Sequence, residues 1–368
     1  MAGLVYVGNY TDSIYGCALG ADGALTKVNS SPAGGPAPSF LAKSAGGKFV
    51  YATLEGGAEG QIASFSVGAG GALTALNVVG AGGLWPCHVL TNGTQVFCAN
   101  YGGGNISSFN VQPDGSLSVA VATMQHEGAL AHCEISGQGD RQEAAHAHQV
   151  CLSPDGKYLF SMDLGHDTVF CWALDAATGL LTANGSVRLA EKAGPRHLCF
   201  HPSGKHAYLI NELSNTVVSF DYADGKLSET GTSPCVPEGA TFNKVPPPYE
   251  AGDFDGTVSC CADIHAHPNG KFVYGSNRGH DSITTFAVSA ADGTLTVGAN
   301  TPTQGFTPRN FVIAADGLTM LVANQNAGAV EGGTGGGNVV AFAIDGETGA
   351  LTPTGAVSEM KWPVCVLL

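Results

Sequence analysis

The sequence predicts a closed β-propeller of seven four-stranded antiparallel blades, and three observations support this all-β fold class. A frame of roughly 46 to 67 residues recurs seven times along the chain, as expected of an array of similar structural units. Within each frame, apolar residues alternate with a period of two on either side of a glycine-bearing turn, which is typical of short antiparallel hairpins. The two chain ends carry complementary parts of one frame, so the ring can close.

The first two strands of each frame, called strands A and B, form its most regular part. A proline or small residue opens strand A, a turn with glycine follows, and strand B is rich in aromatic residues and ends near an asparagine. Six frames have this order uninterrupted, namely PSFLAKSAGGKFVYATLE from Pro38, PCHVLTNGTQVFCANY from Pro86, AHQVCLSPDGKYLFSMDL from Ala147, PRHLCFHPSGKHAYLINE from Pro195, ADIHAHPNGKFVYGSNR from Ala262 and PRNFVIAADGLTMLVANQ from Pro308. Each is expected to form a hairpin.

Two further strands, C and D, complete each frame. Strand C carries valine and phenylalanine, as in GQIASFSV and GNISSFNV, and strand D is a short run after a turn, as in DGSLS and ADGTLT. The C-terminal PVCVLL matches only strand A, whereas the N-terminal LVYVGNY matches strand B. The last strand is therefore expected to complete the blade that the first strand begins, which makes residues 1–368 a single domain.

Composition and charge exclude several classes of partner. The chain has 53 glycines and a charged fraction of 12%, which suits tight turns that join buried strands. Its net charge of −15 disfavours binding to nucleic acid or anionic membranes. No apolar run approaches the ~18 residues of a membrane span, and the N-terminus lacks the basic start and apolar core of a signal peptide. Most of the 11 cysteines fall on strand positions, where free thiols pack as small apolar groups. We expect a cytoplasmic monomer with reduced cysteines and no cofactor.

The ends of strands A and B are predicted to gather the polar side chains of the repeat. In a hairpin, the first residue of strand A and the last residue of strand B lie side by side, opposite the connecting turn. All seven pairs should therefore surround one face of the ring at the central channel, here called the mouth. The first residues of strand A are Ser39, Cys87, His148, Arg196, Ala262, Arg309 and Val364. Strand B ends at Asn9-Tyr10, Leu54-Glu55, Asn100-Tyr101, Asp163-Leu164, Asn211-Glu212, Asn277-Arg278 and Asn324-Gln325.

Arginines and lysines are segregated between the two faces of the predicted ring. Three of the five arginines, Arg196, Arg278 and Arg309, fall on mouth positions. Lysines instead follow the turn glycine on the opposite face, as do Lys48, Lys157, Lys205 and Lys271. A guanidinium fork suits carboxylate or phosphate, so the pattern predicts an anion site, with the mouth residues Asn211, Asn277 and Glu55 as further binding groups. The alternative is that each arginine is neutralised by an acidic residue of a neighbouring blade.

Two other mouth residues, His148 and Glu212, are candidates for proton transfer. His148 follows His146 at a spacing of two, which resembles a metal-binding pair on a strand, with Glu134, Cys133 or His126 as a conceivable third ligand. No compact third-ligand motif accompanies the pair, so we predict no metal. Glu212 ends the strand B of the blade that Arg196 opens. Pairing with Arg196 would lower the pKa of this carboxyl, which suits a base better than an acid.

These residues carry a family resemblance. The repeats, together with QHEGALAHCEISGQGDRQEAAHAHQVCLSPDGKY, GPRHLCFHPSGKHAYLINE, ADIHAHPNGKFVYGSNR and TPRNFVIAADG, resemble the seven-bladed lactonase family, which contains propeller-type 6-phosphogluconolactonases and the fungal carboxy-cis,cis-muconate cyclase. The resemblance covers nearly the full length. It implies that His148, Arg196, Glu212 and Arg278 line the active site. One departure is Ala144-Ala145, where the family often has proline before the first histidine, which leaves the path of this loop open.

The resemblance leads to a mechanistic hypothesis for a phosphorylated sugar lactone. Arg278 and Arg309 would bind the phosphate, Glu212 or His148 would activate water, and Arg196 would stabilise the developing oxyanion. There is no G-x-S-x-G motif, so a covalent acyl-enzyme is not expected. Two alternatives stay open: a lactone-forming cyclase that holds a tricarboxylate with the same arginines, and a non-enzymatic scaffold propeller, although the Trp-Asp strand endings usual in scaffolds are absent.

Three insertions exceed the regular period, at 120–146, 231–261 and 328–338. The first two are expected to emerge at the mouth, where they could line the sides of the substrate cleft. The first could also bring Arg141 to the site. The glycine-rich third is interpreted as surface decoration.

Overall fold

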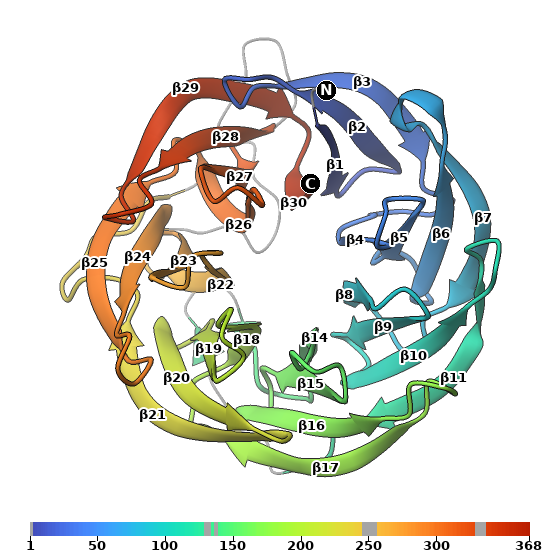
Figure 1. Cartoon of the computed structure of the whole chain (residues 1–368), viewed down its shortest axis with the longest axis horizontal. Helices are drawn as coiled ribbons and strands as arrows, with labels where there is room; N and C mark the ends of the chain where they lie inside the picture. Colours follow the sequence, from blue (N-terminus) through green and yellow to red (C-terminus); the bar gives the residue numbers. More distant parts are fainter. Residues whose placement is uncertain (1–2, 129–133, 136–138, 245–255, 328–335) are drawn as a thin grey trace.

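A computed structural model of the chain describes residues 3–128, 134–135, 139–244, 256–327 and 336–368. Within these residues, seven four-stranded antiparallel sheets stand around a central channel (Figure 1). The predicted all-β propeller is confirmed. The described part contains no α-helix and only one short 3-10 helix, Ala69–Gly71. No helix in these residues is long and apolar enough to cross a membrane.

Each blade runs from strand A at the channel to strand D at the rim. Blade 1 contains β30 (Pro363–Leu367), β1 (Leu4–Asn9), β2 (Ser13–Leu19) and β3 (Leu25–Pro32); blade 2 contains β4 (Leu41–Lys43), β5 (Phe49–Leu54), β6 (Gln61–Val67) and β7 (Leu73–Gly80); blade 3 contains β8 (Pro86–Thr91), β9 (Gln95–Asn100), β10 (Asn105–Val111) and β11 (Leu117–Gln125). Blade 4 contains β14 (Ala147–Leu152), β15 (Tyr158–Asp163), β16 (Thr168–Leu174) and β17 (Leu181–Arg188); blade 5 contains β18 (Pro195–Phe200), β19 (His206–Asn211), β20 (Thr216–Ala223) and β21 (Lys226–Pro234). Blade 6 contains β22 (Cys260–Ala266), β23 (Phe272–Arg278), β24 (Ser282–Val288) and β25 (Leu295–Pro302); blade 7 contains β26 (Phe306–Ile313), β27 (Thr319–Asn326), β28 (Gly337–Ile344) and β29 (Leu351–Met360).

The ring closes through the two chain ends, as predicted. Strand β30 pairs antiparallel with β1, with Val7 opposite Val366 and Gly8 opposite Cys365. The C-terminal strand is therefore strand A of the blade whose other three strands come from the N-terminus. This pairing removes the two open sheet edges that an unclosed array would leave.

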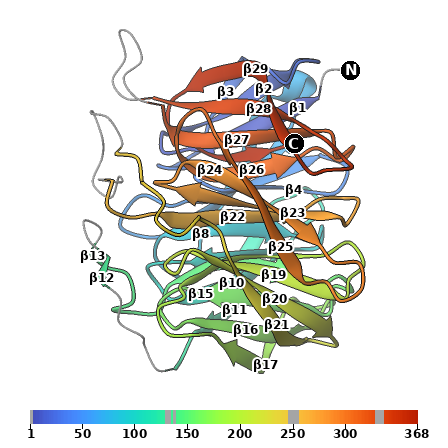
Figure 2. The same cartoon turned by 90° about the vertical axis from the view of Figure 1, so that its left-hand side faces the viewer.

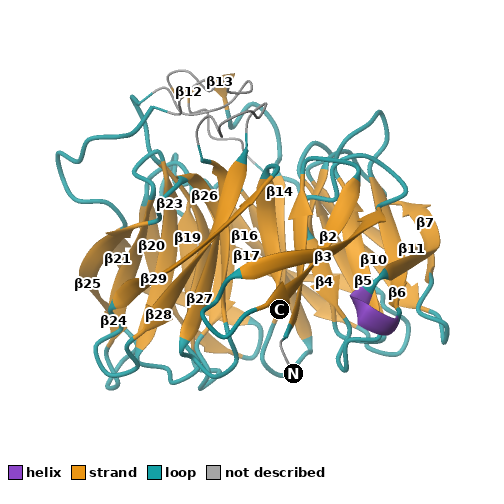
Figure 3. Ribbon diagram, turned by 90° about the horizontal axis from the view of Figure 1, so that it is seen from above, coloured by secondary structure: helices purple, strands orange, loops and turns teal. Residues whose placement is uncertain are grey.

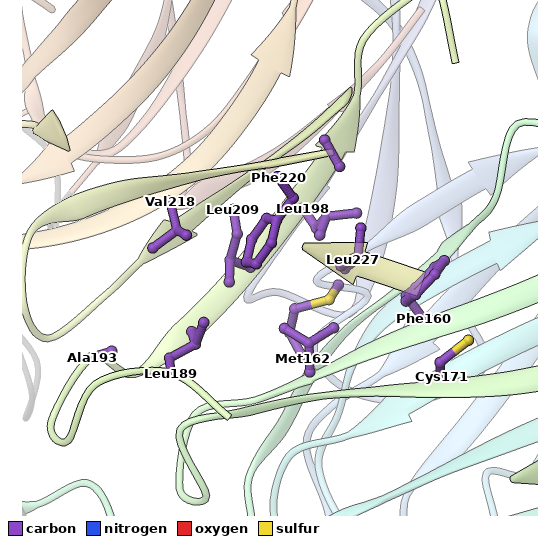
Figure 4. Packing of buried hydrophobic residues seen from close by; sticks show 12 residues of the cluster. Phe160, Met162, Cys171, Leu189, Ala193, Leu198, Leu209, Val218, Phe220 and Leu227 are labelled. Carbon is purple, nitrogen blue, oxygen red and sulfur yellow. The ribbon is translucent and has the colours of Figure 1, made fainter. Parts of the chain in front are cut away.

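The hydrophobic core lies between neighbouring blades. The cluster between blades 4 and 5 contains Phe160 and Met162 from β15 and Leu198, Leu209 and Phe220 from β18, β19 and β20 (Figure 4). These side chains alternate along their strands with residues that face the adjoining blade on the other side. Because each sheet is covered on both faces, the strands read as nearly continuous apolar runs, and the rigid packing fixes where the strand ends lie.

A buried hydrogen-bond network crosses blade 4. The Trp172 indole donates to Ser161 Oγ (2.9 Å), Ser161 Oγ lies 2.8 Å from His126 Nε2, and His126 Nδ1 lies 2.7 Å from Asp163 Oδ2. The ionised Asp163 carboxylate can only accept, so His126 Nδ1–H donates to it, and Ser161, whose oxygen accepts from the indole, has its hydroxyl hydrogen available for His126 Nε2. Ser161 is completely buried. The Ser-His-Asp order is therefore structural, and His126 is not free to bind a metal.

Replacing His126 with alanine is expected to lower the free energy of unfolding by about 2–4 kcal/mol, because the change leaves buried polar atoms unpaired and opens a cavity. Urea unfolding measures this loss. The matched control is His206→Ala, whose ring contacts the exposed Asp221 carboxylate at 2.9 Å and should cost less than about 1 kcal/mol. Equal losses of unfolding free energy in the two variants would show that the buried network stabilises the fold no more than the surface pair does.

Candidate active site

A narrow pocket opens at the mouth. Six of the seven residues predicted from the sequence to begin strand A line it, namely Ser39, Cys87, His148, Arg196, Arg309 and Val364. Tyr10, Phe40, Glu55 and His197 complete its lining. The seventh, Ala262, accepts a hydrogen bond from Arg196 Nη1 through its carbonyl oxygen at 2.6 Å. The structure thus brings the predicted ring of strand A residues together around one cavity.

A repeated backbone contact holds the residues after strand B at this mouth. The N–H groups of Glu55, Tyr101 and Glu212 donate to the carbonyl oxygens of Ala37, Trp85 and Gly194, at 3.0, 2.9 and 2.7 Å respectively. Each acceptor directly precedes the proline that opens strand A, and each has a positive φ, of 54°, 50° and 64°. Residues before proline usually stay extended, so this left-handed turn is a specific feature that directs the chain back to the strand B end.

Strand A is bulged at Cys87, His148, Arg196 and Arg309 in blades 3, 4, 5 and 7, and at Ala262–Asp263 in blade 6. The extra residue lets two consecutive side chains reach the channel, so Arg196 and His197 both line the mouth pocket. The second residues of all seven strands line a further cavity deeper in the channel, here called the lower compartment: Phe40, His88, Gln149, His197, Asp263, Asn310 and Cys365.

Glu212 is the centre of an arginine cluster. Its Oε2 lies 2.9 Å from Arg196 Nε and 3.0 Å from Arg278 Nη2, and its Oε1 lies 2.8 Å from Arg141 Nη1. The carboxylate side chain is 1% exposed. The alternative interpretation, neutralisation by an acidic residue of a neighbouring blade, therefore holds for Arg278, whereas Arg196 pairs with Glu212 within its own blade. Arg141, Arg196 and Arg278 thus share the one carboxylate of Glu212.

The electrostatics of this cluster make Glu212 a poor base. Burial alone raises the pKa of the Glu212 carboxyl, but Arg141, Arg278 and Arg196 outweigh burial and hold its pKa well below the usual range. A carboxylate so strongly stabilised as the anion accepts a proton only with difficulty. Glu212 is better suited to orienting the arginines than to activating water.

Arg278 and Arg309 differ in the contacts that their guanidinium groups make with other protein groups. Arg278 is buried and also donates from Nε to the Cys260 carbonyl and from Nη2 to the Cys261 carbonyl, at 3.3 and 3.1 Å. Arg309 lies over the Tyr10 ring at 5.5 Å and contacts Gln325 Oε1 at 3.4 Å. Among the described residues Arg309 forms no ion pair with a carboxylate, and it lines the mouth pocket. Arg309 is therefore the more available anion-binding group.

His148 offers an unused ring nitrogen at the pocket. Its Nδ1 is buried and has no hydrogen-bond partner among the described residues, and its ring meets Tyr101 edge-on at 5.7 Å. Burial, with Arg196 and His197 nearby, lowers the pKa of His148 well below its usual range. The imidazole is thus neutral at physiological pH, with a lone pair available.

His146 occupies a different environment from His148. It stacks on Tyr101 at 4.2 Å, and its two ring nitrogens contact the Tyr101 carbonyl and the Glu143 carboxylate, both at 3.0 Å. Cys133 lies outside the described residues. In the part of the chain that the structure describes, no three histidine, cysteine, aspartate or glutamate side chains are grouped as metal ligands.

The two predicted asparagines are held inside their blades. Asn211 Nδ2 donates to Thr216 Oγ1 at 3.0 Å, and Asn277 Nδ2 lies within 3.4 Å of Ser282 and Thr284 oxygens. Both side chains are buried. They shape the turn from strand B to strand C, so we assign neither of them to substrate binding. Glu55 lines the pocket as predicted.

The first insertion reaches the site. Arg141, which precedes blade 4, contacts Glu212 and donates from Nε to the Tyr101 hydroxyl at 3.0 Å. The short pair β12 (Glu134–Ile135) and β13 (Gly139–Asp140) stands outside the ring on one face in both side views (Figures 2 and 3). Most of the glycine-rich 328–338 insertion, and the 245–250 stretch of the second, lie outside the described residues.

Tyr10 and Tyr101 were placed at the mouth from the sequence but given no role, and His197 was not placed there. The two tyrosines carry a usable signal, because both follow an asparagine at the end of strand B and so share the position of Glu212. His197 had none. Period-two alternation places neighbours on opposite faces, whereas the bulged strand β18 brings both Arg196 and His197 to the channel.

Comparison with known proteins agrees with this architecture. A family model described as lactonase, 7-bladed β-propeller, matches residues 4–368. The chain belongs to this lactonase family. It is 32% identical over 370 residues to a 6-phosphogluconolactonase of Bacillus subtilis, covering 98% of this chain and 97% of the relative.

Two solved structures are also similar over nearly their whole lengths. The crystal structure of a putative 6-phosphogluconolactonase from Bacteroides fragilis has a TM-score of 0.83 and 32% identity, over 99% of this chain and 97% of that one. A periplasmic gluconolactonase of Pseudomonas aeruginosa has a TM-score of 0.84 and 28% identity, over 99% and 98%. The family resemblance, drawn from the repeats and four sequence stretches, is confirmed.

Proposed function

We propose that this protein hydrolyses a sugar lactone, most specifically 6-phosphogluconolactone. The observation that carries the proposal is the mouth pocket, where the neutral imidazole of His148 and two arginines from different blades line one cavity. The relatives named 6-phosphogluconolactonase support the substrate class.

Hydrolysis of a δ-lactone needs a proton acceptor for the attacking water. His148 is the group best suited to this role, since its ring is neutral and the residue lines the pocket. His148 takes the water proton as the oxygen attacks the carbonyl carbon, and then returns it to the ring oxygen as the carbon–oxygen bond breaks. No covalent intermediate with the protein is required.

The developing oxyanion needs an oriented donor. Arg196 Nε is bonded to Glu212, and its Nη1 is bonded to the Ala262 carbonyl. Its Nη2 has no partner among the described residues, and the residue lines the pocket. A guanidinium held rigidly on one side can present the remaining N–H groups to a carbonyl oxygen without reorganisation, which is what favours the transition state.

Glu212 then acts as a brace instead of a base. Its negative charge holds Arg141, Arg196 and Arg278 close together, which their mutual repulsion would otherwise prevent. The phosphate is assigned to Arg309, with Arg278 adding positive potential from behind. Glu55 and Tyr10 line the side of the pocket near Arg309 and are suited to sugar hydroxyls. We also propose a cytoplasmic location, in keeping with the ten free cysteines of the described residues.

The deciding experiment follows lactone opening by purified protein in excess of the spontaneous rate. We expect opening of 6-phosphogluconolactone, and no conversion of carboxy-cis,cis-muconate. Conversion of the muconate alone would establish the cyclase alternative, and inertness toward both would leave the scaffold alternative.

Arg309→Ala is expected to raise KM for 6-phosphogluconolactone by roughly tenfold or more, through loss of a charged contact to phosphate. KM for unphosphorylated gluconolactone should stay within about twofold. Lys205→Ala, a change to an exposed cation on the opposite face, is the control and should alter neither value. A parallel rise for both lactones on Arg309→Ala would remove the phosphate assignment.

A further inference from the structure

Arg196 is held from three directions. Besides Glu212 and the Ala262 carbonyl, its Nη1 lies 3.3 Å from Nε2 of the neighbouring His197. Both side chains are about 2% exposed. The bulge in β18 makes the contact possible, because it places two consecutive side chains on the channel side.

The chemistry of the two partners fixes the tautomer of His197. A guanidinium nitrogen can only donate, so His197 Nε2 must carry the lone pair. The ring proton then sits on Nδ1, which lies 2.7 Å from Asp263 Oδ1. An imidazolium would direct a second N–H at Arg196 and is disfavoured, and burial together with Arg196 lowers the pKa of His197 to about 4.

Asp263 is well placed to hold that tautomer. Its Oδ1 also accepts from the Ile264 N–H at 2.9 Å, and its Oδ2 accepts from Asn310 Nδ2 at 2.6 Å and lies 3.1 Å from His265 Nε2. The carboxylate is buried among donors, and it can only accept when ionised. Its side chain reaches the channel at the bulge in β22, one blade further round the ring from His197.

We propose that His197 and Asp263 are positioning residues that orient Arg196 through a fixed Nδ1–H tautomer, an inference that rests on the proposed function for its catalytic consequence. Asp263 receives the proton of His197 Nδ1, and His197 Nε2 receives a hydrogen bond from Arg196 Nη1. With Nε and Nη1 both engaged, Arg196 can turn only its Nη2 group toward the pocket. Neither His197 nor Asp263 needs to touch the substrate.

Two substitutions at His197 separate its two contacts. Glutamine keeps an acceptor near the position of Nε2, and asparagine keeps a donor near the position of Nδ1. We expect H197N to lower kcat roughly tenfold or more, with KM within about threefold, and H197Q to retain most of the wild-type kcat. D263N should lower kcat in the wild type but add little in the H197N background, since Asp263 acts through His197.

The matched control is His265→Asn, which removes another partner of the same carboxylate without touching the path to Arg196. H265N should leave kcat within about twofold, and thermal unfolding of all variants identifies losses that are only structural. Equal kcat for H197Q and H197N, or a loss in H265N as large as in H197N, would overturn the proposal.

A second measurement does not depend on activity. Long-range ¹H–¹⁵N correlation of histidine-labelled protein, with His197 assigned from its absence in H197N, reports which ring nitrogen is protonated. We expect the Nδ1–H tautomer in wild type and its loss in D263N. An Nε2–H tautomer or an imidazolium in wild type would overturn the positioning role. Absence of lactone opening by the wild type, with the tautomer as expected, would instead overturn the proposed function and leave the geometry intact.

Discussion

Glu212→Gln is expected to be the most damaging single substitution at the mouth. The amide keeps the shape of the side chain but removes the charge that compensates Arg141, Arg196 and Arg278 at contacts of 2.8 to 3.0 Å. Leaving buried charges uncompensated costs about 3–5 kcal/mol of folding free energy. Chemical unfolding should detect this loss, and lactone opening above the spontaneous rate should fall roughly a hundredfold as Arg196 loses its orientation.

The same substitution distinguishes a brace from a base. If Glu212 accepted the water proton, E212Q would lose activity while its stability stayed near that of the wild type. Glu55→Gln serves as the control, because Glu55 lines the same pocket and forms no ion pair among the described residues. E55Q should change stability by less than about 1 kcal/mol.

The pH dependence of stability follows from the lowered pKa of Glu212. A carboxyl whose folded-state pKa lies below its unfolded value contributes stability that is fully present above the unfolded pKa, about 4.3 for glutamate. That contribution is lost as pH falls through the folded-state value. The difference in stability between wild type and E212Q should therefore be constant above about pH 6 and shrink as the solution is made more acidic than about pH 4.

His148→Asn is expected to lower kcat by a factor of roughly 10² to 10⁴, the range typical of a lost general base, with little change in KM or in stability. The matched control is His88→Asn. His88 is also buried, and its Nδ1 also lacks a partner among the described residues, but it lines the lower compartment and not the mouth pocket. H88N should keep kcat within about threefold.

The pH profile adds a second check on His148. Because burial and Arg196 lower the pKa of this histidine, the ring stays neutral well below the usual titration range near pH 6.5. The enzymatic kcat, after subtraction of spontaneous opening, should therefore be flat from about pH 8 to pH 6. A loss of activity centred near pH 6.5 that disappears in H148N would show that the imidazole titrates normally. An unchanged kcat in H148N would exclude it as the base.

Much of this architecture could be predicted from the sequence, because the repeat is a property of local patterning. Alternating apolar runs and glycine turns predicted the blades, and the unequal chain ends predicted the closure that β30 and β1 make. Strand ends in a hairpin are neighbours whatever the surroundings. For this reason His148, Arg196 and Arg309 could be assigned to one pocket from their places in the repeat.

Only the tertiary structure decided which of these side chains pair with one another and which remain available to a substrate. The charge on Glu212 is shared by arginines from the first insertion, from blade 5 and from blade 6, and no sequence interval specifies such convergence. The bulges that bring His197 and Asp263 to the channel break the period-two rule from which side-chain direction is inferred. The sequence alone determined which residues stand at the mouth, because that depends on strand order. The fold determined which of them remain free to meet a substrate, because that depends on contacts between blades.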